Sequence, residues 1–215
     1  HAKLRQHVQT EAHGILHATP HVQAAHLQAG GFDEVERVHG GAVLGFRDAW
    51  RGVLDDDWEP LDVQRCRGIL PRGGTILGTS RVQPYQFSDG VEKVRAAIGR
   101  HELDGFVVVG GDGSLSAARD LQADGINCVG VPKTIDNDIA ATEMTFGFDT
   151  AVHVATAAID RLHTTAEAHD RVMVVEVMGR GAGHIAVRSG IAGGSTMTLI
   201  PEVPFDIAEV CEALQ

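Results

Sequence analysis

Three apolar segments that each lead into a glycine-rich, polar loop constrain the fold of this chain more than any other feature. The segments span residues 105–109, 126–131 and 172–177, and valine is their commonest residue. A short β-branched run without polar alternation is typical of a strand that is buried on both faces, as in a parallel sheet. Strands joined through helices form right-handed crossovers. The sequence therefore predicts an α/β fold, a doubly wound, mostly parallel sheet with helices on both faces.

Weaker signals predict the remaining elements. Helical spacing of apolar residues indicates helices at 115–121 and 150–163. The strand at 126–131 should stop at Pro132, because proline has no N–H to donate. Further strands are expected at 14–16, 42–46, 68–70 and 196–200.

The composition of the 215-residue chain excludes several classes of protein. The formal net charge is −11, whereas a non-specific nucleic-acid binder needs a basic surface. No apolar run reaches the roughly 18 residues of a membrane span, and no basic-then-apolar leader opens the sequence. The three cysteines are too widely spaced for a disulfide framework or a zinc site. We therefore expect a cytoplasmic protein that binds neither nucleic acid nor membrane.

Residues 110–114, Gly-Gly-Asp-Gly-Ser, follow the strand expected at 105–109. A glycine-rich loop at this point exposes backbone N–H groups, and the dipole of the next helix also favours a bound anion. The carboxylate of Asp112 would repel an anion, but it suits a divalent cation that also contacts phosphate oxygens. The alternative is a tight turn in which Asp112 caps the helix.

Residues 132–138, Pro-Lys-Thr-Ile-Asp-Asn-Asp, follow the strand expected at 126–131. The carboxylates of Asp136 and Asp138 are costly to crowd together without a purpose. A carboxylate at this point is suited to accept a proton from an attacking hydroxyl, and Thr134 to hydrogen-bond a phosphoryl oxygen. A polar turn without chemistry is the alternative.

Three arginines accompany further glycine-rich stretches. Arg180 lies in the turn 178–183 that follows the third strand, and Arg171 precedes that strand. Arg81 closes the stretch 73–81, which also carries three glycines. A guanidinium group binds phosphate through two hydrogen bonds, although a solvated loop explains each arginine taken alone.

The combination of these loops is more specific than each loop alone. The carboxyl ends of neighbouring parallel strands meet at one edge of a sheet, so we expect the three loops together there. Arginines and backbone dipoles would face a phosphate, with Asp112 on a metal ion and a second carboxylate as base. These groups are typical of phosphoryl transfer. A local basic cluster and a metal ion also allow a chain with a net charge of −11 to bind an anion.

The same motifs resemble those of the 6-phosphofructokinase family. The resemblance runs in one order from about residue 32 to residue 215. The stretches that carry it are 45–52, 73–81, 110–114, 132–138, 145–151, 174–180, 191–194 and 201–202. It implies a phosphofructokinase-like fold and a glycolytic kinase that moves the terminal phosphoryl of ATP to the 1-hydroxyl of fructose 6-phosphate.

The resemblance also implies a role for each matching residue. Asp136 resembles the base that takes the proton from the sugar hydroxyl, and Thr134 and Arg180 complete the catalytic set. Substrate contacts are implied for Thr134, Asp136, Asp138, Arg171, Met178, Gly179 and Arg180. Donor contacts are implied for Arg81, Gly111, Asp112, Gly113, Ser114 and Lys133. Asp112 resembles the residue that holds Mg²⁺.

Two positions bear on the phosphoryl donor. In the family, glycine at the position of Gly113 leaves room for the nucleotide, whereas aspartate there is typical of enzymes that use pyrophosphate. Glycine at the position of Lys133 is usual in ATP enzymes and lysine in pyrophosphate enzymes, so this pair is mixed. An aspartate at position 113 would crowd and repel the α-phosphate, whereas Lys133 only adds a hydrogen-bond donor. We therefore expect ATP, with pyrophosphate as the alternative.

The resemblance fails at both ends of the chain. The family's first strand leads into a Gly-Gly-Asp loop that meets the donor phosphates, but residues 17–23 carry neither a glycine pair nor an aspartate. Seven of the twelve histidines lie in the first 39 residues, and His13 and His17 have the spacing of a helical metal site. A local shift of the reading frame is our hypothesis for this stretch, with a solvated tail or a metal site as alternatives. The family's chain also continues beyond residue 215, so we expect the C-terminal part to be truncated.

These observations predict three regions: an atypical His-rich segment at 1–31, a nucleotide-binding α/β domain at 32–150 and the incomplete start of a sugar-phosphate-binding part at 151–215. Family members are usually homotetramers, and Arg171 resembles an arginine that reaches the substrate of a neighbouring subunit. A tetramer is therefore the assembly that the resemblance implies for the intact protein.

Two other functions stay open at this point. A lipid or NAD kinase also uses a Gly-Gly-Asp-Gly loop, although the motifs at 132–138 and 178–180 argue against it. The second alternative is a truncated, non-catalytic homologue that binds nucleotide or pairs with a full-length subunit.

Overall fold

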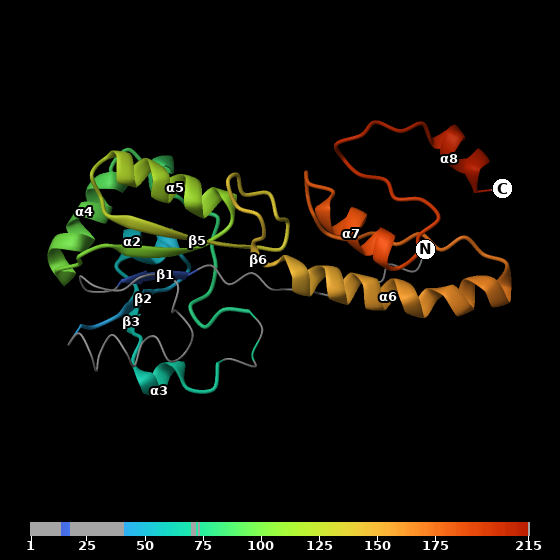
Figure 1. Cartoon of the computed structure of the whole chain (residues 1–215). Helices are drawn as coiled ribbons and strands as arrows, with labels where there is room; N and C mark the ends of the chain where they lie inside the picture. Colours follow the sequence, from blue (N-terminus) through green and yellow to red (C-terminus); the bar gives the residue numbers. More distant parts are fainter. Residues whose placement is uncertain (1–13, 18–40, 70–71, 73, 215) are drawn as a thin grey trace. The chain divides into compact units, whose positions relative to one another are not determined.

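The computed structural model describes residues 14–17, 41–69, 72 and 74–214, and the chain divides into two compact units. The first unit ends at Lys133 and the second begins at Thr134. Figure 1 shows the elements of both units. The functional division at residues 31 and 150 stays a prediction, because compactness does not show what a unit binds.

The first unit holds a sheet whose strands are ordered β3-β2-β1-β4-β5. Its elements are β1 (Gly14–His17), β2 (Leu44–Phe46), α2 (Trp50–Asp55), β3 (Trp58–Pro60), α3 (Val63–Cys66), the 3-10 helix η2 (Pro84–Gln86), α4 (Gly90–His101), β4 (Phe106–Gly110), α5 (Asp112–Ala123) and β5 (Cys128–Thr134). The strands expected at 14–16, 42–46, 105–109 and 126–131 and the helix expected at 115–121 are thereby confirmed.

Strand direction changes across this sheet. The pair β4 and β5 is parallel, as expected for strands joined through helix α5. By contrast, β1 is antiparallel to β4 and to β2, and β2 is antiparallel to β3. Only residues 47–57 separate β2 from β3, which is shorter than the dozen or more residues of a parallel crossover. The α/β class is confirmed. The parallel pair of the described sheet, β4 and β5, is the pair that leads into the polar stretches 110–114 and 132–138.

Both faces of the sheet are covered by apolar side chains. Phe106 and Val108 of β4 belong to a cluster with Trp50 and Leu121, from helices α2 and α5. Val107, which points to the opposite face, belongs to a second cluster that contains Cys66 of α3. Alternate residues of a strand point to opposite faces, so this apolar run packs on both sides, as its valines predict.

The sequence predicted that this strand stops at Pro132. That prediction is wrong, because β5 continues to Thr134. Pro132 lies opposite Gly110, at the last register position of the β4 ladder. The missing N–H of proline therefore falls at the end of this ladder, where its loss costs little.

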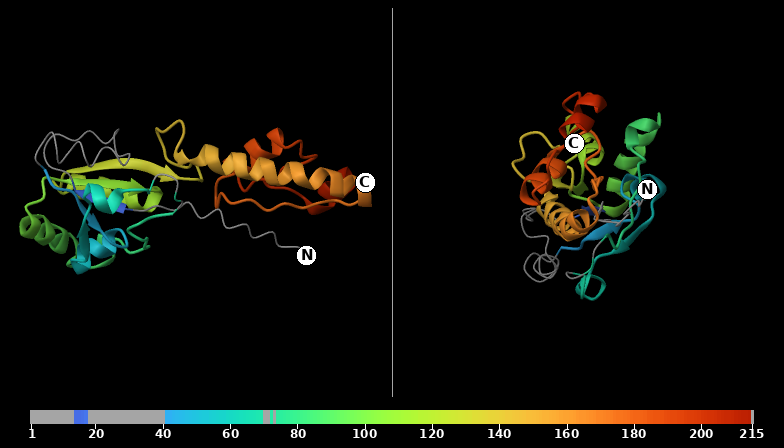
Figure 2. Two further views of the ribbon diagram at one scale, coloured as in Figure 1. Left: turned by 90° about the horizontal axis from the view of Figure 1, so that it is seen from below. Right: turned by 90° about the vertical axis from the view of Figure 1, so that its right-hand side faces the viewer.

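The second unit is built around one long helix. Its elements are β6 (Phe146–Gly147), α6 (Phe148–His169), α7 (His184–Ala192) and α8 (Ile207–Ala213). Helix α6 confirms and extends the helix expected at 150–163, and α7 packs along it, as two views show (Figures 1 and 2). Helix α6 ends at His169, and its C-cap residue Asp170 has a left-handed φ of 48°. Among the described residues, no helix is both long enough and apolar enough to span a membrane.

Three expected strands are wrong. Residues 172–177 form no strand, and Val174 is 90% exposed. Residues 196–200 are likewise irregular. Of the segment 68–70, Leu70 lies outside the described residues, and Gly68 has a φ of 76°, which suits a turn rather than a strand. A strand needs a neighbour to complete its hydrogen bonds, and no described strand pairs with these segments. An apolar β-branched run indicates that a segment favours an extended strand, but it does not indicate whether a neighbouring strand is there to pair with it.

Gly52 gives a test of the packing between β2, α2 and β3. A Cβ on Gly52 would lie 2.7 Å from the backbone atoms Arg47 N and Asp57 O, which hydrogen-bond to each other. Backbone atoms in a sheet cannot move aside cheaply, so Gly52→Ala should lower the free energy of unfolding by about 2 kcal/mol or more. Urea denaturation measures this change.

The matched control for this prediction is Gly99→Ala in helix α4. A Cβ on Gly99 meets nothing within 4 Å. Alanine at an open helical position should stabilise the protein by about 0.5–1 kcal/mol. An equal effect of the two substitutions would contradict the close approach at Gly52.

Candidate active site

The loop after β4 is shorter than the sequence suggested. Gly111 is the N-cap of helix α5, and Asp112 is already its first residue. The alternative in which the Asp112 side chain caps the helix is therefore wrong. In an α-helix the first N–H groups have no acceptor within the helix, so the turn formed by Asp112, Gly113 and Ser114 presents donors to an anion. Asp112 is exposed on this turn.

A buried tryptophan holds this first turn in place. Trp50 is 1% exposed, and its indole Nε1 donates to the carbonyl of Ser114 at 3.4 Å. The two residues are 64 positions apart. Sequence reasoning missed Trp50, because an apolar aromatic residue in a helix predicts only a core position.

The register of β4 and β5 brings two predicted donor contacts to one edge of the sheet. Gly110 pairs with Pro132, so Gly111 and Lys133 each stand one residue further along parallel neighbours. Two of the three expected strands therefore end at a common edge, as predicted, whereas residues 172–177 form no strand that would bring the third loop to that edge. Lys133 is half-buried.

Arg81 lies on the segment that leads from α3 to the 3-10 helix η2. It is exposed, and its carbonyl accepts a hydrogen bond from Gln86 Nε2 at 3.5 Å. The nearby Gln83 reaches the first turn of α5, because a Cβ on Gly113 would lie 2.9 Å from Gln83 Nε2. Gln83 is a second residue that the sequence did not single out, since only the tertiary fold places it beside Gly113.

The loop that carries the candidate base is closed by its own hydrogen bonds. The amide of Asp136 donates to Thr134 Oγ1 at 3.2 Å, and Thr145 Oγ1 donates to the carbonyl of Thr134 at 2.7 Å. The amide of Thr145 donates to Asn137 Oδ1 at 2.9 Å. These contacts hold Asp136 half-buried and Asp138 exposed on a defined loop.

Thr134 keeps a hydrogen-bond donor in this arrangement. Its hydroxyl oxygen accepts from the Asp136 amide, and a hydroxyl that accepts one hydrogen bond still has its own O–H to donate. This geometry suits the predicted contact of Thr134 with a phosphoryl oxygen.

The turn that carries Arg180 is also closed locally. Gly179 is buried with a φ of 151°, and Arg180 has a left-handed φ of 55° and is exposed. Ala182 N donates to Gly179 O at 2.8 Å, and Gly183 N donates to Glu202 Oε1 at 2.6 Å. The hydrogen bond from Gly183 lowers the pKa of the Glu202 carboxyl. Glu202 therefore closes the turn as a carboxylate, a role that its place in the matching stretch 201–202 did not reveal.

One apolar cluster joins the two loops of the second unit. Ile135, which stands between Thr134 and Asp136, is 6% exposed and packs with Phe148 and Ile185. Val177, which directly precedes Met178, packs against the same cluster. The structure thus brings the loop 134–138 together with the turn 178–180, in which Met178 is exposed.

Arg171 lies apart from these loops. It follows the C-terminal end of α6, whereas Phe148 of the shared cluster begins that helix (Figure 1). Helix α6 has 22 residues and so spans about 33 Å at 1.5 Å per residue. Arg171 is exposed at the far end, a helix length away from the cluster that holds the loop 134–138.

The acidic residues suit a metal that takes most of its ligands from elsewhere. Among the described residues, no group of three or more His, Cys, Asp or Glu side chains is arranged to hold a metal ion. Mg²⁺ in phosphoryl-transfer sites is bound through one or two carboxylates together with phosphates and water. A single exposed carboxylate on the first turn of α5, that of Asp112, fits such a role. His13 lies outside the described residues, so the alternative metal site stays a prediction.

Comparison with known sequences identifies the family. The model of the phosphofructokinase family matches residues 33–215. The chain is 56% identical over 174 residues to a pyrophosphate–fructose 6-phosphate 1-phosphotransferase of Amycolatopsis methanolica, covering 81% of this chain and 51% of the relative. It is 57% identical over 172 residues to ATP-dependent 6-phosphofructokinase 3 of Streptomyces coelicolor, covering 80% of this chain and 50% of the relative. The chain spans about half the length of the curated relatives it matches.

Solved structures agree with this assignment. Phosphofructokinase from Pichia pastoris in the T-state aligns with a TM-score of 0.76 at 25% identity, covering 86% of this chain and 20% of that one. A pyrophosphate-dependent phosphofructokinase from Marinobacter aquaeolei aligns with a TM-score of 0.64 at 27% identity, covering 78% of this chain and 46% of that one. Together with the ordered loops described above, these matches show that the chain belongs to the phosphofructokinase family.

Proposed function

We propose that this chain carries the donor-binding and catalytic residues of a 6-phosphofructokinase, which transfers the terminal phosphoryl of ATP to the 1-hydroxyl of fructose 6-phosphate in glycolysis. The observation that carries the proposal is the parallel pairing of β4 with β5. It places the first turn of α5 beside Lys133, and the loop with Asp136 follows directly along the chain. The proposed donor turn and Lys133 therefore lie at the same edge of one sheet, and Asp136 is three residues further along the chain.

The residues divide the work of the reaction among them. Asp136 takes the proton of the sugar 1-hydroxyl, and Thr134 donates to an oxygen of the transferred phosphoryl. Arg180 offsets the negative charge that develops in the transition state, and Asp138, Met178 and Gly179 contact the sugar phosphate. Mg²⁺, when held by Asp112, supplies neutralisation of the donor phosphates.

The donor site supports ATP over pyrophosphate. Gly113 has no side chain to repel a nucleotide phosphate, and the nearest atom to a Cβ there is the mobile end of Gln83. Gly111, Ser114 and Arg81 complete the donor contacts. Relatives with ATP and with pyrophosphate in their names are almost equally similar to this chain, at 57% and 56% identity, so overall similarity does not decide the donor.

We also propose that the intact protein is a cytoplasmic homotetramer, with a nucleotide-binding domain at 32–150 and a sugar-phosphate-binding part that begins at 151. The position of Arg171 supports a shared active site. It is exposed at the end of α6 remote from Asp136, and so is placed to contact the substrate of another subunit.

The test is an assay of the purified 215-residue chain with fructose 6-phosphate, Mg²⁺ and either ATP or pyrophosphate. We expect formation of fructose 1,6-bisphosphate with ATP, and loss of that product when EDTA removes the metal. Turnover with pyrophosphate alone would contradict the proposed donor. Binding of MgATP without turnover would favour the non-catalytic homologue, and phosphorylation of NAD or a lipid would favour the other kinase classes.

A further inference from the structure

We propose that Glu59 and Arg65 are positioning residues for the phosphoryl donor, acting through a strap that consists of residues 74–83. The inference rests on the proposed function only for the identity of the bound ligand, the phosphoryl donor. At one end of the strap, Gln83 lies beside Gly113 of the proposed donor turn, and Arg81 stands two residues before it; Arg65, which is bonded to Glu59, holds the other end.

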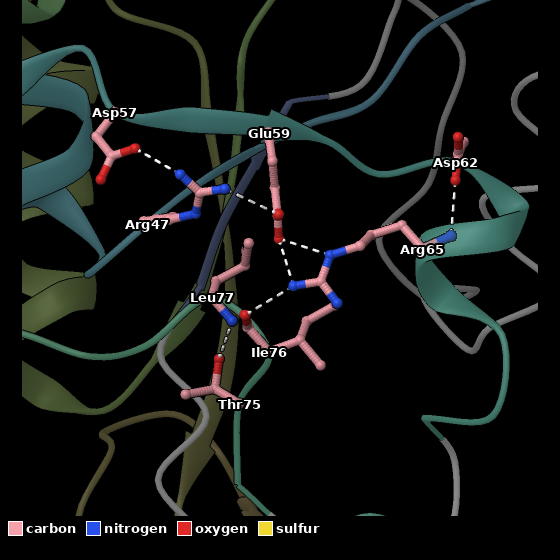
Figure 3. Close-up of polar contacts among 8 residues, drawn as sticks. All are labelled: Arg47, Asp57, Glu59, Asp62, Arg65, Thr75, Ile76 and Leu77. Carbon is pink, nitrogen blue, oxygen red and sulfur yellow. Dashed lines mark hydrogen bonds and ion pairs between the residues drawn. The ribbon is translucent and has the colours of Figure 1, made fainter.

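The contact between Arg65 and the strap is direct. Arg65 Nη2 donates to the carbonyl of Ile76 at 3.2 Å, and Arg65 Nε donates to Glu59 Oε1 at 2.9 Å (Figure 3). Arg65 Nη2 also lies 2.7 Å from Glu59 Oε1. One guanidinium group therefore bridges a strand carboxylate and a strap carbonyl, and its fork keeps both bonds in one plane.

The Glu59 carboxylate is shared with a second arginine. Its Oε2 accepts from Arg47 Nη2 at 3.1 Å, and Arg47 Nη1 donates to Asp57 Oδ1 at 2.8 Å (Figure 3). The Glu59 side chain is only 14% exposed, and the hydrogen bond from Arg65 lowers its pKa. The carboxylate therefore stays charged and fixed between two guanidinium groups, which is a rigid support for Arg65.

Helix α3 fixes the backbone from which Arg65 extends. Asp62 is the N-cap of this helix, and its Oδ1 accepts from the amide of Arg65 at 2.7 Å (Figure 3). Backbone and side chain of Arg65 are thus both held, so the position of its guanidinium group depends on residues 59–65 rather than on the strap.

The strap is held close to β2 at the same end. Asp48 N donates to the carbonyl of Leu77 at 2.7 Å, and the Leu77 side chain is 5% exposed within the second core cluster. Gly78 has a φ of 79°, and a Cβ there would collide with Asp48 Oδ1. The strap therefore passes residue 78 in one defined conformation.

The far end of the strap meets the donor loop. Gln86 Nε2 donates to the carbonyl of Arg81, and Gln83 Nε2 would lie 2.9 Å from a Cβ on Gly113. Arg65 bonds the strap five residues before Arg81. Loss of that bond should widen the range of positions of Arg81 and Gln83 and so weaken donor binding, while contacts to the sugar phosphate stay unchanged.

The experiment compares Arg65→Met with the matched control Arg67→Met. Arg67 is also exposed and lies two residues further along the chain, and its side chain makes no hydrogen bond within the described residues. Two readouts are used on the 215-residue chain: amide hydrogen exchange of residues 75–82, and the KM values for MgATP and for fructose 6-phosphate. Arg65→Met should raise exchange across 75–82 and raise the KM for MgATP about fivefold, the factor expected for one lost hydrogen bond of about 1 kcal/mol. Glu59→Gln should act in the same direction.

A rescue variant and the stability of the fold separate positioning from general damage. Arg65→Lys keeps a charge that can reach Glu59, and should recover part of the donor KM. Unchanged exchange in Arg65→Met, an equal rise of both KM values, or the same effect from Arg67→Met would overturn the proposal. If the parent chain binds no donor, the proposed function fails, and the positioning role in donor binding fails with it. The hydrogen-exchange data still show in that case whether Arg65 holds the strap.

Discussion

Asp136→Asn is expected to lower the kcat for transfer from ATP about 10³-fold, the middle of the range for loss of a general base. Asparagine keeps the shape of the side chain but cannot accept the proton of the sugar hydroxyl. The hydrogen bonds made by the Asp136 amide and by Thr145 do not involve the Asp136 carboxylate, so these bonds should survive the substitution. Steady-state kinetics measures kcat, and isothermal titration measures the Kd for MgATP. This Kd should change less than twofold, which is less than the effect of losing one weak hydrogen bond.

The control for this prediction is Asp160→Asn, which removes an exposed carboxylate on helix α6, outside the loops of the site. Its kcat should equal that of the parent chain. A normal rate in Asp136→Asn would overturn the assignment of the base. A fall in kcat accompanied by loss of MgATP binding would show that Asp136 supports the fold of the site rather than the proton transfer.

Gly113→Asp should lower kcat/KM for MgATP about 100-fold, equivalent to about 2.7 kcal/mol, while turnover with pyrophosphate falls less or rises. The new carboxylate would stand on the first turn of α5, where the donor phosphates are proposed to bind. Its Cβ would meet Gln83 Nε2 at 2.9 Å, which is the end of a flexible side chain and can move aside. Charge repulsion and crowding of the nucleotide, rather than a clash within the protein, therefore cause the loss.

Gly113→Asn is the matched variant, since it has the same shape without the charge. If charge dominates, asparagine should cost much less kcat/KM for MgATP than aspartate. Equal losses in the two variants would assign the effect to crowding. Unchanged kcat/KM in Gly113→Asp would contradict the placement of the nucleotide beside this turn.

Local patterns in the sequence predicted the framework of the site. The valine run of β4 predicted a strand packed on both faces, and the glycine-rich motif after it predicted the turn from which the next helix begins. The apolar period of 3.6 residues predicted helix α6. These features succeed because burial pattern and turn chemistry act over a few neighbouring residues.

The wrong strands show the limit of the same patterns. Residues 172–177 are as rich in valine as β4, yet Val174 is 90% exposed and the segment pairs with no described strand. Whether a segment pairs as a strand depends on the strand that lies beside it, and the sequence of the segment does not specify that neighbour.

By itself, the sequence determined the α/β class, the strands β4 and β5 and the polar loops that follow them, because strand, turn and helix signals are local. Only the tertiary structure decided how these parts are held. It placed Trp50 against Ser114, Gln83 against Gly113, Glu202 against Gly183, and Arg65 against Ile76. It also separated Arg171 from Asp136 by the length of a helix. These contacts join residues 11 to 64 positions apart, and only the packing of the whole chain brings such residues within hydrogen-bond distance.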